Sequence, residues 1–354
     1  YRYFGPNNQS SVAFFPAYPS LMALVTLAVG DPVFAGIIVT FLCGAGVAGL
    51  FPPPGTLELG EDVARTALAV LLVYPYAWYL FGAVYADALF VLAVLGAFLL
   101  LEHDHPIWAG LVGAVATAGR PVGTAVVLGL VAVLLERRGV LRLGPIDRWR
   151  RSPPPAARTE GPLVDLRRLR PGDAGVLLSV LGLALWSAYL WHRFGAPTLF
   201  AKVQGAQGWA QEPGPATWFK SEWLRVVSDL PGNLSDWLDG FVVPGYNPGT
   251  RALYAIGTTT QGVLLVGAIA LSPLVLKRVG WGYALYVLAV LGIPLLGSKD
   301  FQGTGRYVLA AFPVFAVVGA SLVRRPAVRV AWLATSALLL LGWASFYARG
   351  YYVA

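Results

Sequence analysis

The chain has 354 residues, of which 57% are hydrophobic and only 12% are charged. Soluble domains carry about 25% charged residues and roughly 45–50% apolar ones, so this composition excludes a soluble single domain, a disordered chain and a disulfide scaffold. The formal net charge is +8, and the single cysteine, Cys43, allows no intrachain disulfide and no cysteine-based metal site.

Apolar runs long enough to cross a bilayer recur along the whole chain. A hydrocarbon core about 30 Å thick needs about 20 apolar residues per helix. About ten runs fit this length, at 12–30, 33–51, 64–82, 84–101, 107–136, 174–192, 252–276, 280–298, 307–323 and 327–347. The sequence therefore predicts an all-α polytopic membrane protein that forms one integral membrane domain over residues 1–354.

The fifth run, 107–136, is interrupted by Gly119-Arg120-Pro121. It is too long for one straight span and too short for two, and a proline kinks a helix. We treat it as one long or broken helix. If it forms two spans instead, the orientation of the whole front half of the chain inverts.

Loop charges set the expected orientation, because cytoplasmic loops carry an excess of Arg and Lys. The segment 137–172 holds ten arginines against three acids, a net charge of +7, and is predicted to be a basic cytoplasmic loop. The segment 193–251 is then a large extracytoplasmic loop. With one span at 107–136, the expected outer segments also include the N-terminus, 52–63, His103-Asp104-His105, 299–306 and the C-terminus. Since one loop carries most of the net charge, the basicity does not indicate a nucleic-acid partner.

An amphipathic helix is predicted inside the large outer loop. From 216 to 230, apolar residues such as Trp223 recur at helical spacing, and Lys220 and Arg225 fall elsewhere on the helical wheel. This pattern fits an interfacial helix on the outer leaflet. A plug packed between the spans is the alternative.

Charged residues next to apolar spans are candidate functional residues, because charge is expensive in a bilayer. Lys299 and Arg306 flank a glycine-rich turn, and a cation beside such backbone at a helix start suits a phosphate. Ordinary loop charge is the alternative. His192 and Arg193 end the sixth predicted span and are candidates for substrate contact or for an interfacial anchor.

Asp87 and Arg120 interrupt two apolar runs. They are interpreted as an intramembrane pair with either a structural or a substrate-binding role. The sequence has no P-loop, dinucleotide fingerprint, Gly-x-Ser-x-Gly or His-Glu-x-x-His motif, so no cofactor is expected and no divalent metal is indicated.

Five short motifs, in order along the chain, resemble those of the bacterial PIG-V-like membrane mannosyltransferases, relatives of GPI mannosyltransferase II. They lie at 11–21, 74–90, 118–123, 191–197 and 306–313. Asp87 stands where the family has the acid of a Tyr-Ser-Glu-Ser-Leu-Phe-like run. The resemblance implies a GT-C-type bundle and an inverting glycosyltransferase. Its donor is expected to be polyprenyl-phosphate-mannose, and its acceptor a lipid-linked or cell-envelope glycan.

The resemblance also implies roles for individual residues. Arg306 and Lys299 are expected to bind the donor phosphate. The residues expected to line the substrate site are His192, Arg193, Tyr18, Tyr307, Asp300 and Gln302. Residues 1–11 contain no acid, so the catalytic Asp is expected upstream of Tyr1, in a chain that is truncated at its N-terminus.

The expected location is a bacterial plasma membrane, because Arg, Ala, Gly and Pro are abundant and lysine is rare. Two other functional classes remain open. One is a polytopic transporter or lipid flippase, and the other is a non-catalytic scaffold subunit of a glycosyltransferase.

Overall fold

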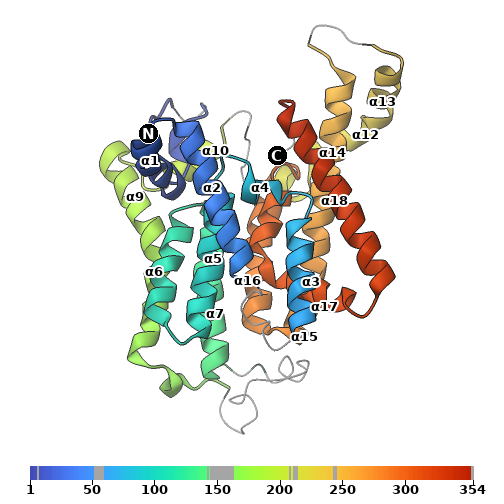
Figure 1. Cartoon of the computed structure of the whole chain (residues 1–354). Coiled ribbons are helices and arrows are strands. Elements are labelled where there is room, and N and C mark those ends of the chain that lie inside the picture. Colours follow the sequence, from blue (N-terminus) through green and yellow to red (C-terminus); the bar gives the residue numbers. More distant parts are fainter. Residues whose placement is uncertain are drawn as a thin grey trace.

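The computed structural model describes residues 1–5, 8–51, 60–141, 143, 163–206, 209, 214–241 and 245–351. Over these residues the chain is helical throughout and forms no strand (Figure 1). Four helical stretches are long and apolar enough to cross a bilayer, and they are Pro32–Gly49, Pro171–Phe194, Pro248–Arg278 and Pro326–Ala348. The prediction of an all-α membrane protein is confirmed at this level.

The helices have the following bounds. In the first half they are α1 (Ala17–Val29), α2 (Pro32–Gly49), α3 (Glu61–Leu72), α4 (Trp78–Phe81), α5 (Asp87–Glu102), α6 (Pro106–Thr117) and α7 (Thr124–Arg138). In the second half they are η6 (Pro171–Val180), α9 (Leu181–Phe194), α10 (Leu199–Gln204), α11 (Pro215–Trp218), α12 (Ser221–Ser228), α13 (Leu230–Leu238), α14 (Pro248–Ala270), α15 (Ser272–Arg278), α16 (Trp281–Gly297), η7 (Gly305–Ala310), α17 (Phe312–Leu322) and α18 (Pro326–Ala348).

The predicted run 107–136 is not one helix. The structure divides it into α6 and α7, with Arg120 in an extended conformation (φ −155°, ψ 150°) between them. The reason is local, because a residue that precedes proline is pushed out of the helical region. The expectation of a helix broken at Gly119-Arg120-Pro121 therefore agrees with the structure, whereas the expectation of one long helix does not.

Helices α6 and α7 run antiparallel. Arg138, the last residue of α7, lies 2.6 Å from Asp104 in the turn that precedes α6. The start of α6 and the end of α7 therefore lie at the same end of the bundle, which we call the Arg138 end. Asp87 is the first residue of α5, and Asp104 comes just after the last one. Asp87 therefore lies at the opposite end of the bundle, which we call the Asp87 end (Figure 1).

This hairpin corrects the expected orientation of one loop. The turn His103-Asp104-His105 was expected on the same side as the N-terminus. Instead the N-terminal segment contacts the Asp87 end, where the Ala17 N–H donates to the Ala118 carbonyl at 2.9 Å. Residues 52–59 and, in the basic loop, 142 and 144–162 lie outside the described residues.

The amphipathic segment 216–230 forms two helices, α11 and α12, because Lys220 between them adopts a left-handed conformation (φ 52°). Trp223 on α12 packs perpendicular to Phe301, with 5.3 Å between the ring centroids. Its indole N–H donates to Thr259 Oγ1 on α14 at 3.3 Å. One face of this segment therefore docks on the bundle, while Phe219 remains 76% exposed.

Candidate functional site

Three charged side chains from distant parts of the sequence meet at the Asp87 end. Asp87 lies in the first turn of α5, Arg120 between α6 and α7, and Arg306 in η7. The Arg120 guanidinium donates from Nη1 to Asp87 Oδ1. Arg306 Nη1 lies 3.9 Å from the other oxygen, Oδ2. The interpretation of Asp87 and Arg120 as a pair agrees with this geometry.

The cluster is largely buried. The Asp87 side chain is 3% exposed, that of Arg120 is 10% exposed and that of Arg306 is 16% exposed. One carboxylate stands between two guanidiniums, so the three formal charges leave a net of +1. A cluster in which guanidiniums outnumber carboxylates favours an anionic ligand over a cationic one. The three residues therefore have the charge of an anion-binding site.

Tyrosine rings surround the two guanidiniums. Arg120 Cζ lies 4.4 Å from the ring centroid of Tyr307. Arg306 Cζ lies 5.2 Å from Tyr85 and 5.4 Å from Tyr79. Such cation–π contacts stabilise each cation and fix the plane of the guanidinium. Tyr307 was predicted as a site residue, whereas Tyr79 was not.

The segment that carries Arg306 is held in place by buried hydrogen bonds. Asp300 accepts from the Tyr254 hydroxyl and, at 2.8 Å, from the backbone N–H of Gln302. The Tyr74 hydroxyl donates to the Gly305 carbonyl at 2.7 Å. The structure therefore places Asp300, predicted to line a substrate site, as a buried support of the turn.

A glycine lets this turn approach Arg306. Gly303 adopts φ +76°, and a Cβ at this position would lie 3.4 Å from Arg306 Nη2. A residue with a side chain is strained in this conformation, so glycine is favoured here. The turn thus lies directly against the Arg306 guanidinium.

Lys299, predicted to bind phosphate beside Arg306, faces α12 instead. The pKa of Glu222 is lowered mainly by its hydrogen bond with Arg225, and the charge of Lys299 lowers it further. Arg225 Nη2 lies 2.7 Å from the Glu222 carboxylate. Of the two predicted phosphate ligands, Arg306 lies in the Asp87 cluster, and Lys299 acts on the charge of Glu222.

Three other predicted site residues lie apart from this cluster. The buried Tyr18 hydroxyl donates to the Gly36 carbonyl at 3.0 Å and lies 2.9 Å from Thr40 Oγ1, so it joins α1 to α2. His192 and Arg193 are exposed in the last turn of α9. Their side chains show no contact with the Asp87 cluster within the described part of the chain.

Lys220 is a residue that the sequence analysis did not identify as important. Its ammonium donates to the carbonyls of Leu295 and Ser298 at the C-terminal end of α16. It also lies 5.4 Å from the ring of Phe301. Burial lowers the pKa of Lys220 to about 8. Lys220 thereby fastens the outer-loop helices to the segment that leads into Arg306, and no local sequence pattern marks its distant carbonyl partners.

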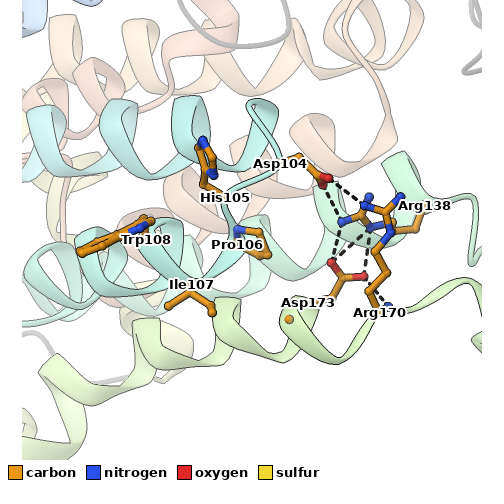
Figure 2. A pocket seen from close by; sticks show the side chains of 9 residues that line it. Asp104, His105, Pro106, Ile107, Trp108, Arg138, Arg170 and Asp173 are labelled. Carbon is orange, nitrogen blue, oxygen red and sulfur yellow. Dashed lines mark hydrogen bonds and ion pairs between the residues drawn. The ribbon is translucent and has the colours of Figure 1, made fainter.

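A second polar network occupies the Arg138 end (Figure 2). Arg138 donates to Asp173 at 2.7 Å and to Asp104 at 2.6 Å, and Arg170 donates to Asp104 at 2.8 Å. Two arginines and two aspartates make this network neutral overall. It borders an open cavity of about 580 Å³ that also contacts Trp108.

Among the described residues, no group of His, Cys, Asp or Glu side chains is arranged to hold a metal ion. Comparison with known proteins gives no match to a protein family, to a curated protein or to a solved structure.

Proposed function

We propose that the chain is a membrane glycosyltransferase. In this proposal it transfers a sugar, mannose according to the resemblance, from a polyprenyl-phosphate donor to a lipid-linked or cell-envelope acceptor. The bundle is of GT-C type with about ten spans, and it works on the outer side of a bacterial plasma membrane. The observation that supports the proposal best is the buried cluster of Asp87, Arg120 and Arg306.

The charge of this cluster suits a lipid phosphate. A guanidinium can bind phosphate oxygens through parallel hydrogen bonds, and a largely water-free site strengthens such bonds. When the glycosidic bond to the donor breaks, negative charge grows on the departing phosphate. Arg306, the more exposed of the two arginines, would stabilise that charge.

The hairpin of α6 and α7 also supports the proposal. With 107–136 as a single span, the loop charges would put Asp87 on the cytoplasmic side. With two helices, Asp87 and Arg306 share one end, opposite the basic segment 137–172. The expected orientation then makes the Asp87 end extracytoplasmic, where a polyprenyl-phosphate donor is used.

Asp87 has a positioning role in this mechanism. One of its oxygens accepts from Arg120 and the other faces Arg306, so the carboxylate orients both cations. A carboxylate other than Asp87 would take the proton of the acceptor hydroxyl as general base.

The test is donor turnover in membranes that contain the full-length protein. With radiolabelled polyprenyl-phosphate-mannose, Arg306→Ala should lower turnover by about a hundredfold, the effect of removing one transition-state donor. Arg65→Ala is the matched control, because Arg65 is exposed on α3 and its ion pair among the described residues is with exposed Glu61. Unchanged turnover in Arg306→Ala would refute the phosphate assignment. Movement of an intact lipid across proteoliposomes without sugar release would favour the transporter alternative.

A further inference from the structure

The cavity at the Arg138 end has one polar wall and one apolar wall (Figure 2). Its volume is about 580 Å³, which is within the range of about 300–1,000 Å³ found for small-molecule sites. Arg138, Arg170 and Asp104 form the polar side, and Ile107 and Trp108 on α6 form the other. A ligand for this cavity therefore carries both a charged group and an apolar group.

Most of the hydrogen-bonding capacity that the charged side chains keep in this cavity belongs to arginine donors. The two Asp104 oxygens already accept from Arg138 and Arg170, and the Asp173 side chain is only 2% exposed. The Arg170 side chain is 65% exposed, and its guanidinium donates only from Nη1 among the described residues. The exposed His105 side chain also lines the cavity, on the other side of Asp104 from Arg170 (Figure 2). Both Asp104 oxygens are already bonded to guanidiniums, so a cationic headgroup would compete with these arginines, whereas an anion finds unused Arg170 donors.

Two helices begin at this cavity. The first turn of α6 and the first turn of η6, which continues into α9, both line it. The N-terminal end of a helix carries a partial positive charge because its first N–H groups have no partner within the helix. Arg170 and His105 favour an anion in this cavity, and the two helix ends strengthen that preference.

The apolar wall continues outward along the two helices. Trp108 is 61% exposed and Ile107 is 49% exposed on α6, while Leu177 on η6 is 56% exposed. In a membrane protein, such side chains face lipid tails, and tryptophan is enriched at the level of the headgroups. An acyl chain can therefore lie along this wall while its headgroup enters the cavity.

We propose that this cavity binds the phosphate of an anionic phospholipid. Arg170 and His105 contact the phosphate oxygens, and Ile107 and Trp108 contact the first part of an acyl chain. The described arginines of the basic loop lie at the same end and raise the local concentration of anionic lipid; they are Arg137, Arg138, Arg167, Arg168 and Arg170. This site is at the opposite end from the Asp87 cluster and does not depend on the proposed function.

The test compares two lipids on the purified full-length protein in a non-ionic detergent. Dioleoyl-phosphatidylglycerol and dioleoyl-phosphatidylcholine are added in turn, and the lipid retained per protein is measured by native mass spectrometry. We expect a preference for phosphatidylglycerol that falls about fivefold in Arg170→Gln, since one arginine near the headgroup contributes about that factor. His105→Ala, at an exposed position, should shift the preference in the same direction.

The matched control is Arg324→Gln, which removes an exposed arginine from the turn between α17 and α18 and should leave the preference unchanged. Trp108→Ala should lower the retention of phosphatidylglycerol without removing its preference over phosphatidylcholine. Equal retention of the two lipids by the wild-type chain would overturn the proposal. Displacement of the lipid by an equal concentration of inorganic phosphate would also overturn it, because the site would then select a free anion.

Discussion

Arg138 lies 2.6 Å from Asp104, although 34 residues separate them in the sequence. Because Asp104 precedes α6 and Arg138 ends α7, this contact closes the hairpin of the two helices. The hairpin in turn determines which side chains share an end of the bundle. It puts Asp87 together with Arg306 and away from the arginine-rich segment.

The first prediction concerns the pair of Asp87 and Arg120. Asp87→Asn removes the carboxylate charge between two buried guanidiniums. We expect it to lower the free energy of unfolding by about 3–5 kcal/mol, the usual effect of leaving a buried charge without its partner. Unfolding in detergent by heat or by sodium dodecyl sulfate measures this loss.

A double-variant cycle separates the pair from the individual residues. Asp87→Asn alone leaves two guanidiniums without the carboxylate, whereas the double variant with Arg120→Gln leaves one. The double variant should therefore lose less unfolding free energy than the sum of the two single variants. Strict additivity of the two effects would show that the side chains do not interact in the folded protein.

The second prediction concerns the pH dependence of the outer-loop helices. Burial lowers the pKa of docked Lys220 from 10.5 to about 8. Between about pH 8 and pH 10.5 the undocked lysine is protonated and the docked lysine is largely neutral, so docking releases a proton. Raising the pH through this window therefore favours the docked state, and below pH 8 the dependence ends.

Subtilisin cleavage within residues 214–241 reports this docking. The ratio of the wild-type cleavage rate to that of Lys220→Met at the same pH corrects for the activity of the protease. We expect this ratio to fall between pH 7.5 and pH 9.5, values chosen to bracket the pKa of about 8. A ratio that rises over this range would contradict the assignment of a buried, docked lysine.

The third prediction concerns Glu136, which ends α7 and caps another helix. Its carboxylate accepts from the backbone N–H of Trp281 at 3.1 Å and of Gly282 at 2.8 Å, at the start of α16. Glu136→Gln keeps one acceptor and should cost about 1 kcal/mol of unfolding free energy, as for other helix caps. Glu136→Ala leaves buried N–H groups without an acceptor and should cost about 2–3 kcal/mol. Equal losses in the two variants, by thermal unfolding, would show that the cap is not formed.

The fourth prediction tests the close approach of α2 to the segment around α4. A Cβ at Gly44 would lie 1.9 Å from the Leu80 carbonyl oxygen, so Gly44→Ala forces the backbones apart. We expect a loss of about 1–3 kcal/mol, as for other overpacked cores. Gly267→Ala is the control, because nothing lies within 4 Å of the added Cβ. The thermal midpoints of the two variants in detergent should differ, and equal midpoints would argue against this contact.

Composition was sufficient to predict an all-helical membrane protein, because apolar length and low charge act locally along the chain. The direction of the chain within 107–136 was not predictable from composition. Pro121 indicates a break at Arg120, but whether the chain reverses depends on the contact of Arg138 with Asp104, which no local pattern encodes.

The candidate site was predicted in part. Asp87 and Arg120 stood out because each interrupts an apolar run, and the structure pairs them. His192 was selected by its position at the end of a predicted span and Tyr18 by the motif that contains it, and neither specifies where a side chain points. Lys220 was not identified because its partners are backbone carbonyls at the end of α16, 75 or more residues further along the chain.

Helix α5 has only 16 residues and carries a charged group at each end. At about 1.5 Å per residue its length is roughly 24 Å, less than the roughly 30 Å of an average hydrocarbon core. No residue of α5 is exposed, so other helices and not lipid surround it. Its two charged ends therefore lie closer together than the two faces of the hydrocarbon core, and at least one of them sits within the protein at the depth of the lipid tails.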